Sequence, residues 1–142
     1  MKIAIASDHG GFTLKSYIIE QYKTKGIDLI DLGTNSEESC DYPLIADKLA
    51  EYILQHNADL GILICGTGIG ISIAANRHKG IRAALLYNEQ AAALAKEHNN
   101  ANVAVFGART QSKEEVMKYL EIFLNTPFSN GERHIRRIAE LG

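Results

Sequence analysis

The chain has 142 residues, of which 46% are hydrophobic and 23% charged, and its 15 Lys and Arg side chains against 17 Asp and Glu leave a net charge of −2. This length predicts one domain over residues 1–142, and this composition excludes a disordered, fibrous or disulfide-rich protein. The near-neutral charge excludes the large basic surface on which nucleic-acid and membrane-surface binding depend, so we expect no nucleic-acid partner and no membrane partner.

The first half of the chain predicts three strands and two helices. Residues 2–6 are small and β-branched, as in a buried strand, and glycines follow them in a tight turn. Apolar side chains then recur at four-residue spacing over 14–22, which predicts a helix. A second strand is expected over 27–32, and the Tyr-Pro pair at 42–43 opens a second helix. Residues 60–64 are continuously apolar, which is typical of a strand covered on both faces.

The second half continues the alternation of helices and strands. In order, we expect a helix after the glycine turn at 66–70 through about Arg77, a strand over 81–87, an Ala-rich helix over 88–98, a strand over 103–106, a helix from a capping box at Ser112 and Glu115 through Leu124, and a basic tail over 131–141. Five strands alternating with helices predict a three-layer, doubly wound α/β fold. Its five-stranded parallel sheet is of Rossmann or flavodoxin type, and a C-terminal helical tail follows it.

In such sheets, ligands bind beyond the carboxyl ends of the strands. Polar, small or titratable residues follow four of the predicted strands, at Asp8–Gly11, Cys65–Gly70, Tyr87–Glu89 and Gly107–Arg109. We therefore expect the functional site at this edge of the sheet.

The turn at 66–70 has the spacing G-x-G-x-G, which does not meet the dinucleotide fingerprint G-x-G-x-x-G. Its amide groups and the following helix N-terminus suit a phosphate or an oxyanion, or the turn serves only close packing of strand and helix. Cys65, directly before it, is either a thiolate nucleophile or base, or a small buried side chain. Cys40 lacks such surroundings and is interpreted as a structural or surface residue.

Two free cysteines cannot make a disulfide framework. Because no signal-peptide pattern or bilayer-length apolar run accompanies them, we expect a cytoplasmic location.

Two further groups near the C-terminal end carry charge. His98 and the two asparagines after it end a predicted helix, where a protonated His is favoured, or they are simply capping residues. Arg133 and Arg137 stand on one face of a helix and suit a phosphate, or they belong to a solvated basic tail.

Several blocks occur in order along the chain: SDHGG at 7–11, DYP at 41–43, CGTGIGISIAAN at 65–76, GIRA at 80–83, HNNANV at 98–103, GAR at 107–109 and RHIRR at 133–137. Together they resemble the ribose-5-phosphate isomerase B family, which also contains galactose-6-phosphate isomerase subunits. The match spans residues 1 to about 138 without a large gap. Arg136 lies outside the family pattern and is interpreted as a solvated surface charge.

The resemblance implies an aldose–ketose isomerase that interconverts ribose 5-phosphate and ribulose 5-phosphate through a cis-enediolate, with no cofactor and no metal. Cys65 would be the general base, and His98 and Asp8 would open the furanose ring. The developing oxyanion would be held by Thr67 and by the amides of Gly66, Gly68 and Gly70. The phosphate would be bound by His9, Arg133 and Arg137, with Arg109 a further candidate. Asn99 and Tyr42 would contact sugar hydroxyls.

The resemblance also implies a homodimer or a dimer of dimers, with each site built from two chains, so that His98 and Cys65 meet across an interface. Some relatives carry a Glu at the position of Ile71. Since Ile71 cannot act as a base, proton transfer falls to Cys65. The histidines His9, His98 and His134 have no metal-ligand spacing with Cys65, so we expect no metal site.

Two alternatives remain at this point. A hexose 6-phosphate isomerase acting on allose or galactose 6-phosphate needs only a slightly longer pocket, although the intact Cys-Gly-Thr-Gly block favours the pentose. A non-catalytic, flavodoxin-like module binding a nucleotide or phosphate needs only the glycine turn, and it leaves His98 and the terminal arginines unexplained.

Overall fold

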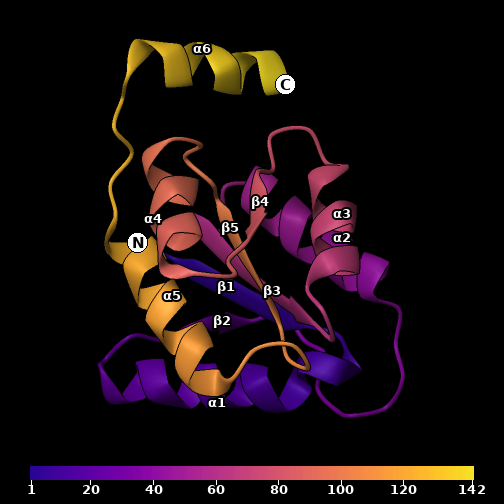
Figure 1. Ribbon diagram of the computed structural model, residues 1–142. Coiled ribbons are helices and arrows are strands. Elements are labelled where there is room, and N and C mark those ends of the chain that lie inside the picture. Colours follow the sequence, from indigo (N-terminus) through magenta and orange to yellow (C-terminus); the bar gives the residue numbers. More distant parts are fainter.

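The structure is a computed structural model that describes all of residues 1–142. Strands alternate with helices along the whole chain (Figure 1). In chain order the elements are β1 (Ile3–Ser7), a single 3-10 turn η1 (His9–Gly11), α1 (Phe12–Thr24), β2 (Ile30–Asp31), α2 (Tyr42–Leu54), β3 (Leu60–Cys65), α3 (Ile69–Asn76), β4 (Ala83–Leu85), α4 (Glu89–Glu97), β5 (Val103–Gly107), α5 (Lys113–Asn125) and α6 (Glu132–Leu141).

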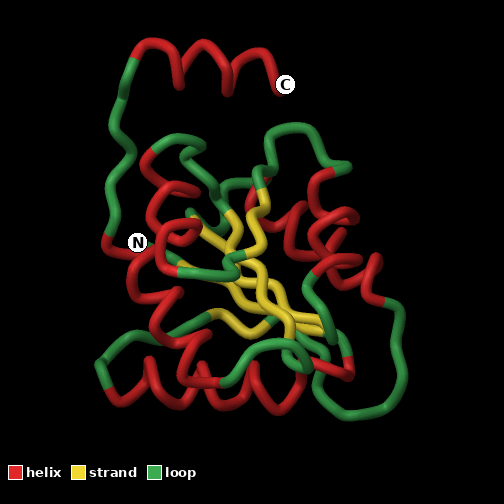
Figure 2. Tube along the Cα trace, viewed as in Figure 1, coloured by secondary structure: helices red, strands yellow, loops and turns green.

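The five strands form one parallel sheet in the order β2-β1-β3-β5-β4, which Figure 2 shows in yellow between the helices. The predicted α/β fold with a five-stranded parallel sheet is confirmed. The chain passes from β3 to the outer position of β4 and then returns to place β5 between them. Because crossovers between parallel strands are right-handed, this reversal places α4 on the opposite face from α3.

A hydrophobic core lies on each face of the sheet. One contains side chains of α1, α4 and α5, and the other contains side chains of α2 and α3. Gly61 in β3 lets α2 approach closely, since a Cβ atom there would lie 2.5 Å from Leu49 Cδ2 and 2.8 Å from Ile53 Cδ1. The cores hold the central strands rigidly, so the loops at their ends have fixed positions.

The two edge strands are shorter than expected. The strand predicted over 27–32 is limited to β2 at 30–31, and the one predicted over 81–87 is limited to β4 at 83–85. Each pairs with only one neighbour, so residues beyond that short ladder adopt other backbone paths. Predictions that depend on residues close together in the sequence agree better with the structure. The capping box of Ser112 and Glu115 is present at the start of α5.

A buried ion pair joins α1 to β2 on the side where the site residues lie. The Lys15 side chain is 1% exposed, and its Nζ donates to both Asp31 carboxylate oxygens at 2.8 and 2.9 Å. Asp31 Oδ1 also accepts the Gly33 N–H at 2.9 Å. Gly33 in turn accepts the Ser7 N–H at 2.8 Å, so the pair fixes the loop beside the end of β1.

Replacing Asp31 with Asn is expected to lower the free energy of unfolding by about 2–4 kcal/mol, because the Lys15 ammonium stays buried without a carboxylate. The expected loss is smaller than for a fully buried ion pair, because the Asp31 side chain is 39% exposed to solvent. Urea denaturation measures the loss. Adding Lys15→Met to Asp31→Asn should recover stability, since it removes the uncompensated charge. Glu121→Gln in the exposed Lys25–Glu121 pair is the matched control, with an expected loss below about 1 kcal/mol. An equal loss in both single variants would contradict this account.

Helix α6 stands apart from the two helical layers (Figure 1). A loop connects it to α5, and His134 is its one buried residue. Ile135 and Leu141 on the same helix are half or more exposed. Every helix of the chain is too short or too polar to cross a bilayer.

Candidate active site

The carboxyl ends of the three central strands lie side by side. In the sheet register Ser7 is opposite Ile64, and Cys65 is opposite Gly107. Asp8 directly follows β1, so its backbone lies beside Cys65. The sheet therefore brings together the loops that the sequence analysis expected at this edge.

Cys65 is buried, and its Sγ accepts a hydrogen bond from the Gly68 N–H at 3.1 Å. Gly68 has a left-handed backbone with φ of 78°, and it is packed too closely for a side chain. A Cβ atom there would lie 2.5 Å from Leu85 Cδ1 and 3.0 Å from the carbonyl carbon of Phe106. The glycine thus allows its amide to point at the Cys65 sulfur.

The loops after β3 and β5 are joined by backbone hydrogen bonds. The Ala108 N–H donates to the Cys65 carbonyl at 2.9 Å, and the Arg109 N–H donates to the Gly66 carbonyl at 2.8 Å. The Arg109 guanidinium lies over Gly66, since a Cβ atom at Gly66 would be 3.1 Å from Arg109 Nη1. A fixed positive charge therefore lies beside the glycine turn.

Asp8 lies near the Arg109 guanidinium, on the opposite side of Gly10. Its carboxylate is buried, and Oδ1 accepts the Gly11 N–H at 3.2 Å. A Cβ atom at Gly10 would be 3.3 Å from Asp8 Oδ1 and 3.5 Å from Arg109 Nη2. Gly10 thus leaves room between an acidic and a basic side chain, a pairing suited to moving protons and holding an anion.

His9 is oriented by the segment that precedes α2. The Cys40 N–H donates to His9 Nδ1 at 3.2 Å. Since Nδ1 accepts this bond, Nε2 carries the ring proton and is the atom able to donate to a ligand. The contact comes from the backbone of Cys40, so its side-chain sulfur takes no part in it.

Tyr42 and Thr67 border the glycine turn. The Tyr42 ring covers Gly70, where a Cβ atom would lie 2.6 Å from Cζ and 2.9 Å from the hydroxyl oxygen. Thr67 is exposed, and its Oγ1 accepts the Ile69 N–H at 3.2 Å. Both hydroxyl groups therefore lie beside the glycine turn that follows Cys65.

A second group of predicted site residues gathers around α6. His98 ends α4, and its ring stacks on that of His134 with the centroids 4.3 Å apart and the planes at 13°. Burial lowers the pKa of His134, and the neighbouring charges of His98, Arg133 and Arg137 lower it further. A polar hollow of about 470 Å³ lies beside the stacked rings. Arg133 places a positive charge at this hollow, whose lining also includes the carboxylates of Glu97 and Glu132.

The two groups lie at opposite ends of the sheet. The His98–Asn102 segment precedes β5, whereas Cys65 pairs with the last residue of β5. At about 3.3 Å per residue, the five residues of β5 separate its ends by roughly 13 Å. Figure 1 shows α6 beyond one end of the sheet and the carboxyl end of β3 at the other. Within one chain, His98 and Cys65 do not meet.

A sequence profile of the ribose/galactose isomerase family matches residues 3–141 of this chain. The chain belongs to this family. Ribose-5-phosphate isomerase B of Escherichia coli is 42% identical over 140 residues, which cover 99% of this chain and 93% of that protein. The resemblance predicted from the sequence blocks is confirmed, and so is membership of an isomerase family.

Solved structures agree with this assignment. Ribose-5-phosphate isomerase B of Clostridium thermocellum has a TM-score of 0.97 and 44% identity, and the match covers 100% of this chain and 95% of that one. The enzyme of Thermotoga maritima has a TM-score of 0.95 and 51% identity, with coverage of 99% and 96%.

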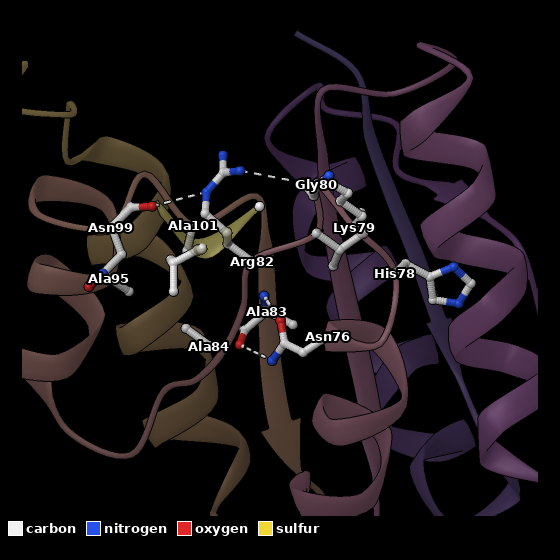
Figure 3. Close-up of a pocket in the computed structure, with 13 residues that line it drawn as sticks. Asn76, His78, Lys79, Gly80, Arg82, Ala83, Ala84, Ala95, Asn99 and Ala101 are labelled. Carbon is white, nitrogen blue, oxygen red and sulfur yellow. Dashed lines mark hydrogen bonds between the residues drawn. The ribbon is translucent and has the colours of Figure 1, made fainter. Parts of the chain in front are cut away.

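One part of this isomerase was not singled out by the sequence analysis. A hollow of about 370 Å³ lies between the end of α3, the start of β4, the end of α4 and the C-terminal residues Leu141 and Gly142, and no acidic side chain lines it (Figure 3). Arg82 crosses it to the segment that follows α4. Arg82 and its partner Asn102 lie within the blocks at 80–83 and 98–103, so the signal was present without a function attached to it.

Proposed function

We propose that this isomerase interconverts ribose 5-phosphate and ribulose 5-phosphate through a cis-enediolate, with Cys65 as the general base. The observation that carries the proposal is the Gly68 amide on Cys65 Sγ within a turn whose other amides are available to an oxyanion. The relatives named ribose-5-phosphate isomerase B support the choice of substrate.

In this mechanism the Cys65 thiolate takes the proton from C2 of the open-chain aldose. The electrons of the C2–H bond form the C1–C2 double bond, and those of the C1 carbonyl move to O1. Amides of Gly66 and Gly70, with the Thr67 hydroxyl, stabilise the enediolate, while the Gly68 amide holds Cys65 Sγ. Cys65 then returns the proton to C1, and the proton on O2 passes to O1, so that C2 becomes the carbonyl carbon of the ketose.

The remaining groups serve ring opening and binding. His98 and Asp8 exchange protons with the ring oxygen and the anomeric hydroxyl. Asn99 and Tyr42 contact sugar hydroxyls. The phosphate is bound by His9, Arg109, Arg133 and Arg137.

The distribution of these groups supports a site shared between two chains in a homodimer or a dimer of dimers. Cys65 and His98 act on neighbouring atoms of one small sugar, yet one chain places them at opposite ends of its sheet. Ile69 and Ile73 form an exposed apolar stripe on α3, directly after the glycine turn, and Leu44 on α2 is also exposed. A two-fold axis would bury these side chains and bring α6 of one chain to the Cys65 edge of its partner.

The deciding experiment compares kcat/KM for ribose 5-phosphate, allose 6-phosphate and galactose 6-phosphate. We expect ribose 5-phosphate to be the best substrate. A higher value for a hexose phosphate would assign the chain to the hexose alternative. Binding of sugar phosphates without turnover of any of them would instead indicate a non-catalytic binding module.

Replacing Arg137 with Ala is expected to raise KM by about 10–100-fold and to change kcat little. A charged hydrogen bond to phosphate contributes about 1.5–3 kcal/mol, and phosphate binding is shared by the ground and transition states. Steady-state kinetics with ribose 5-phosphate measure both constants. Arg136→Ala is the matched control, because Arg136 is exposed and paired only with Glu140 of the same helix. A large loss of kcat at unchanged KM would remove Arg137 from the phosphate site.

A further inference from the structure

Arg82, directly before β4, forms hydrogen bonds to the segment that follows α4. Its Nε donates to the Asn99 carbonyl at 3.1 Å and to the Asn100 carbonyl at 3.2 Å, and its Nη2 donates to the Asn100 carbonyl at 2.9 Å. Nη1 reaches the Gly80 carbonyl at 3.4 Å. Figure 3 shows the guanidinium between the Asn99 and Gly80 segments. One side chain therefore fixes two consecutive carbonyl groups directly after His98.

The charge of Arg82 has no carboxylate partner among the ion pairs of the chain. Burial lowers the pKa of its guanidinium, because the charged form loses hydration. The compensation comes from carbonyl groups at the C-terminal end of α4, where the helix dipole is negative. An apolar side chain would leave the Asn99 and Asn100 carbonyl groups without these donors.

Asn102 closes the same connection from the other side. Its Oδ1 accepts the Arg82 N–H at 2.8 Å, its Nδ2 donates to the Gly80 carbonyl at 2.9 Å, and its backbone N–H donates to the Arg82 carbonyl at 3.1 Å. Between the two attachments, Asn100 has a left-handed backbone with φ of 44°. These hydrogen bonds fix the backbone of residues 99–102, and they thereby fix the position of His98 directly before it.

We propose that Arg82 is a positioning residue that sets the placement of His98 for ring opening and of Asn99 for its contact with a sugar hydroxyl. The proposal rests on the proposed function, in which these two residues meet the sugar. Arg82 touches no substrate atom in this scheme. It acts through the carbonyl groups of residues 99 and 100, and the stacked ring of His134 holds His98 from the other side.

The test separates ring opening from proton transfer at carbon. Deuterium uptake at C1 of ribulose 5-phosphate in D2O, followed by proton NMR, requires Cys65 and the glycine turn but not ring chemistry, because this ketose is acyclic. Net isomerisation of ribose 5-phosphate requires both ring opening and proton transfer at carbon. In Arg82→Gln we expect kcat/KM for net isomerisation to fall by about 10–100-fold, since small misplacements of reacting groups have effects of this size. Deuterium uptake at saturating ketose should stay close to the wild-type rate.

Two variants complete the experiment. Arg82→Lys keeps the charge and can reach only one of the two carbonyl groups, so it should show an intermediate loss of kcat/KM for net isomerisation. It replaces Arg82→Gln in the test if that variant does not fold. Arg77→Gln is the matched control, because Arg77 is exposed and enters no ion pair. Equal losses of isomerisation and deuterium uptake in the Arg82 variants, or no loss of either, would overturn the proposal. Failure of the wild-type protein to catalyse either reaction would instead overturn the proposed function.

Discussion

Replacing Cys65 with Ala is expected to lower kcat for ribose 5-phosphate by about 10²–10⁴-fold, the range that general acid–base catalysis contributes. Ile71 in the helix after the glycine turn has no titratable group, and the proposed mechanism assigns the neighbouring Asp8 to ring opening. Deuterium uptake at C1 of ribulose 5-phosphate should be lost together with net isomerisation. This joint loss distinguishes Cys65 from residues that act only in ring opening.

The fold should survive this substitution. Cys65 Sγ accepts one hydrogen bond, from the Gly68 N–H, and otherwise packs among apolar side chains. Thermal unfolding and phosphate affinity should therefore remain close to wild type. Cys40→Ala is the matched control, because only the backbone of Cys40 contacts His9. A Cys65→Ala variant with near-normal kcat would show that another group is the base.

Mixing two inactive variants is expected to restore activity. In a two-fold dimer, Cys65→Ala and His98→Ala each damage both sites, but a mixed dimer contains one site with neither substitution. Random exchange of subunits makes half of the dimers mixed, so activity should recover to about a quarter of wild type. The measurement is turnover of ribose 5-phosphate before and after exchange at equal concentrations.

The control for this recovery is a mixture of Cys65→Ala with Cys65→Ser, in which every site lacks the thiol. It should stay inactive under the same exchange conditions. Continued inactivity of the Cys65→Ala and His98→Ala mixture, after mass spectrometry has shown that subunits exchanged, would mean that the two residues do not share a site across the interface.

Much of the architecture follows from local patterns. The continuous apolar run of β3 and the helical spacing in α1 reflect burial of one strand on both faces and of one helix on one face. The Ser112–Glu115 capping box depends only on residues three positions apart. Strands β2 and β4 are shorter than the sequence predicts, because the length of an edge strand depends on pairing with its single neighbour. The insertion of β5 between β3 and β4 has no local signal.

For the site, the sequence by itself determined which residues carry chemistry and grouped them in blocks that matched a family. It also determined the glycine turn, since residues without a side chain are needed where Gly68 meets Phe106 and Gly70 meets Tyr42. Only the tertiary structure decided where the groups lie. The direction of β5 separates His98 from Cys65, and the pairing of β4 with β5 brings Arg82 to the end of α4. The physical reason is that apolar periodicity acts over a few residues, whereas strand order and crossovers place residues that are distant in the chain.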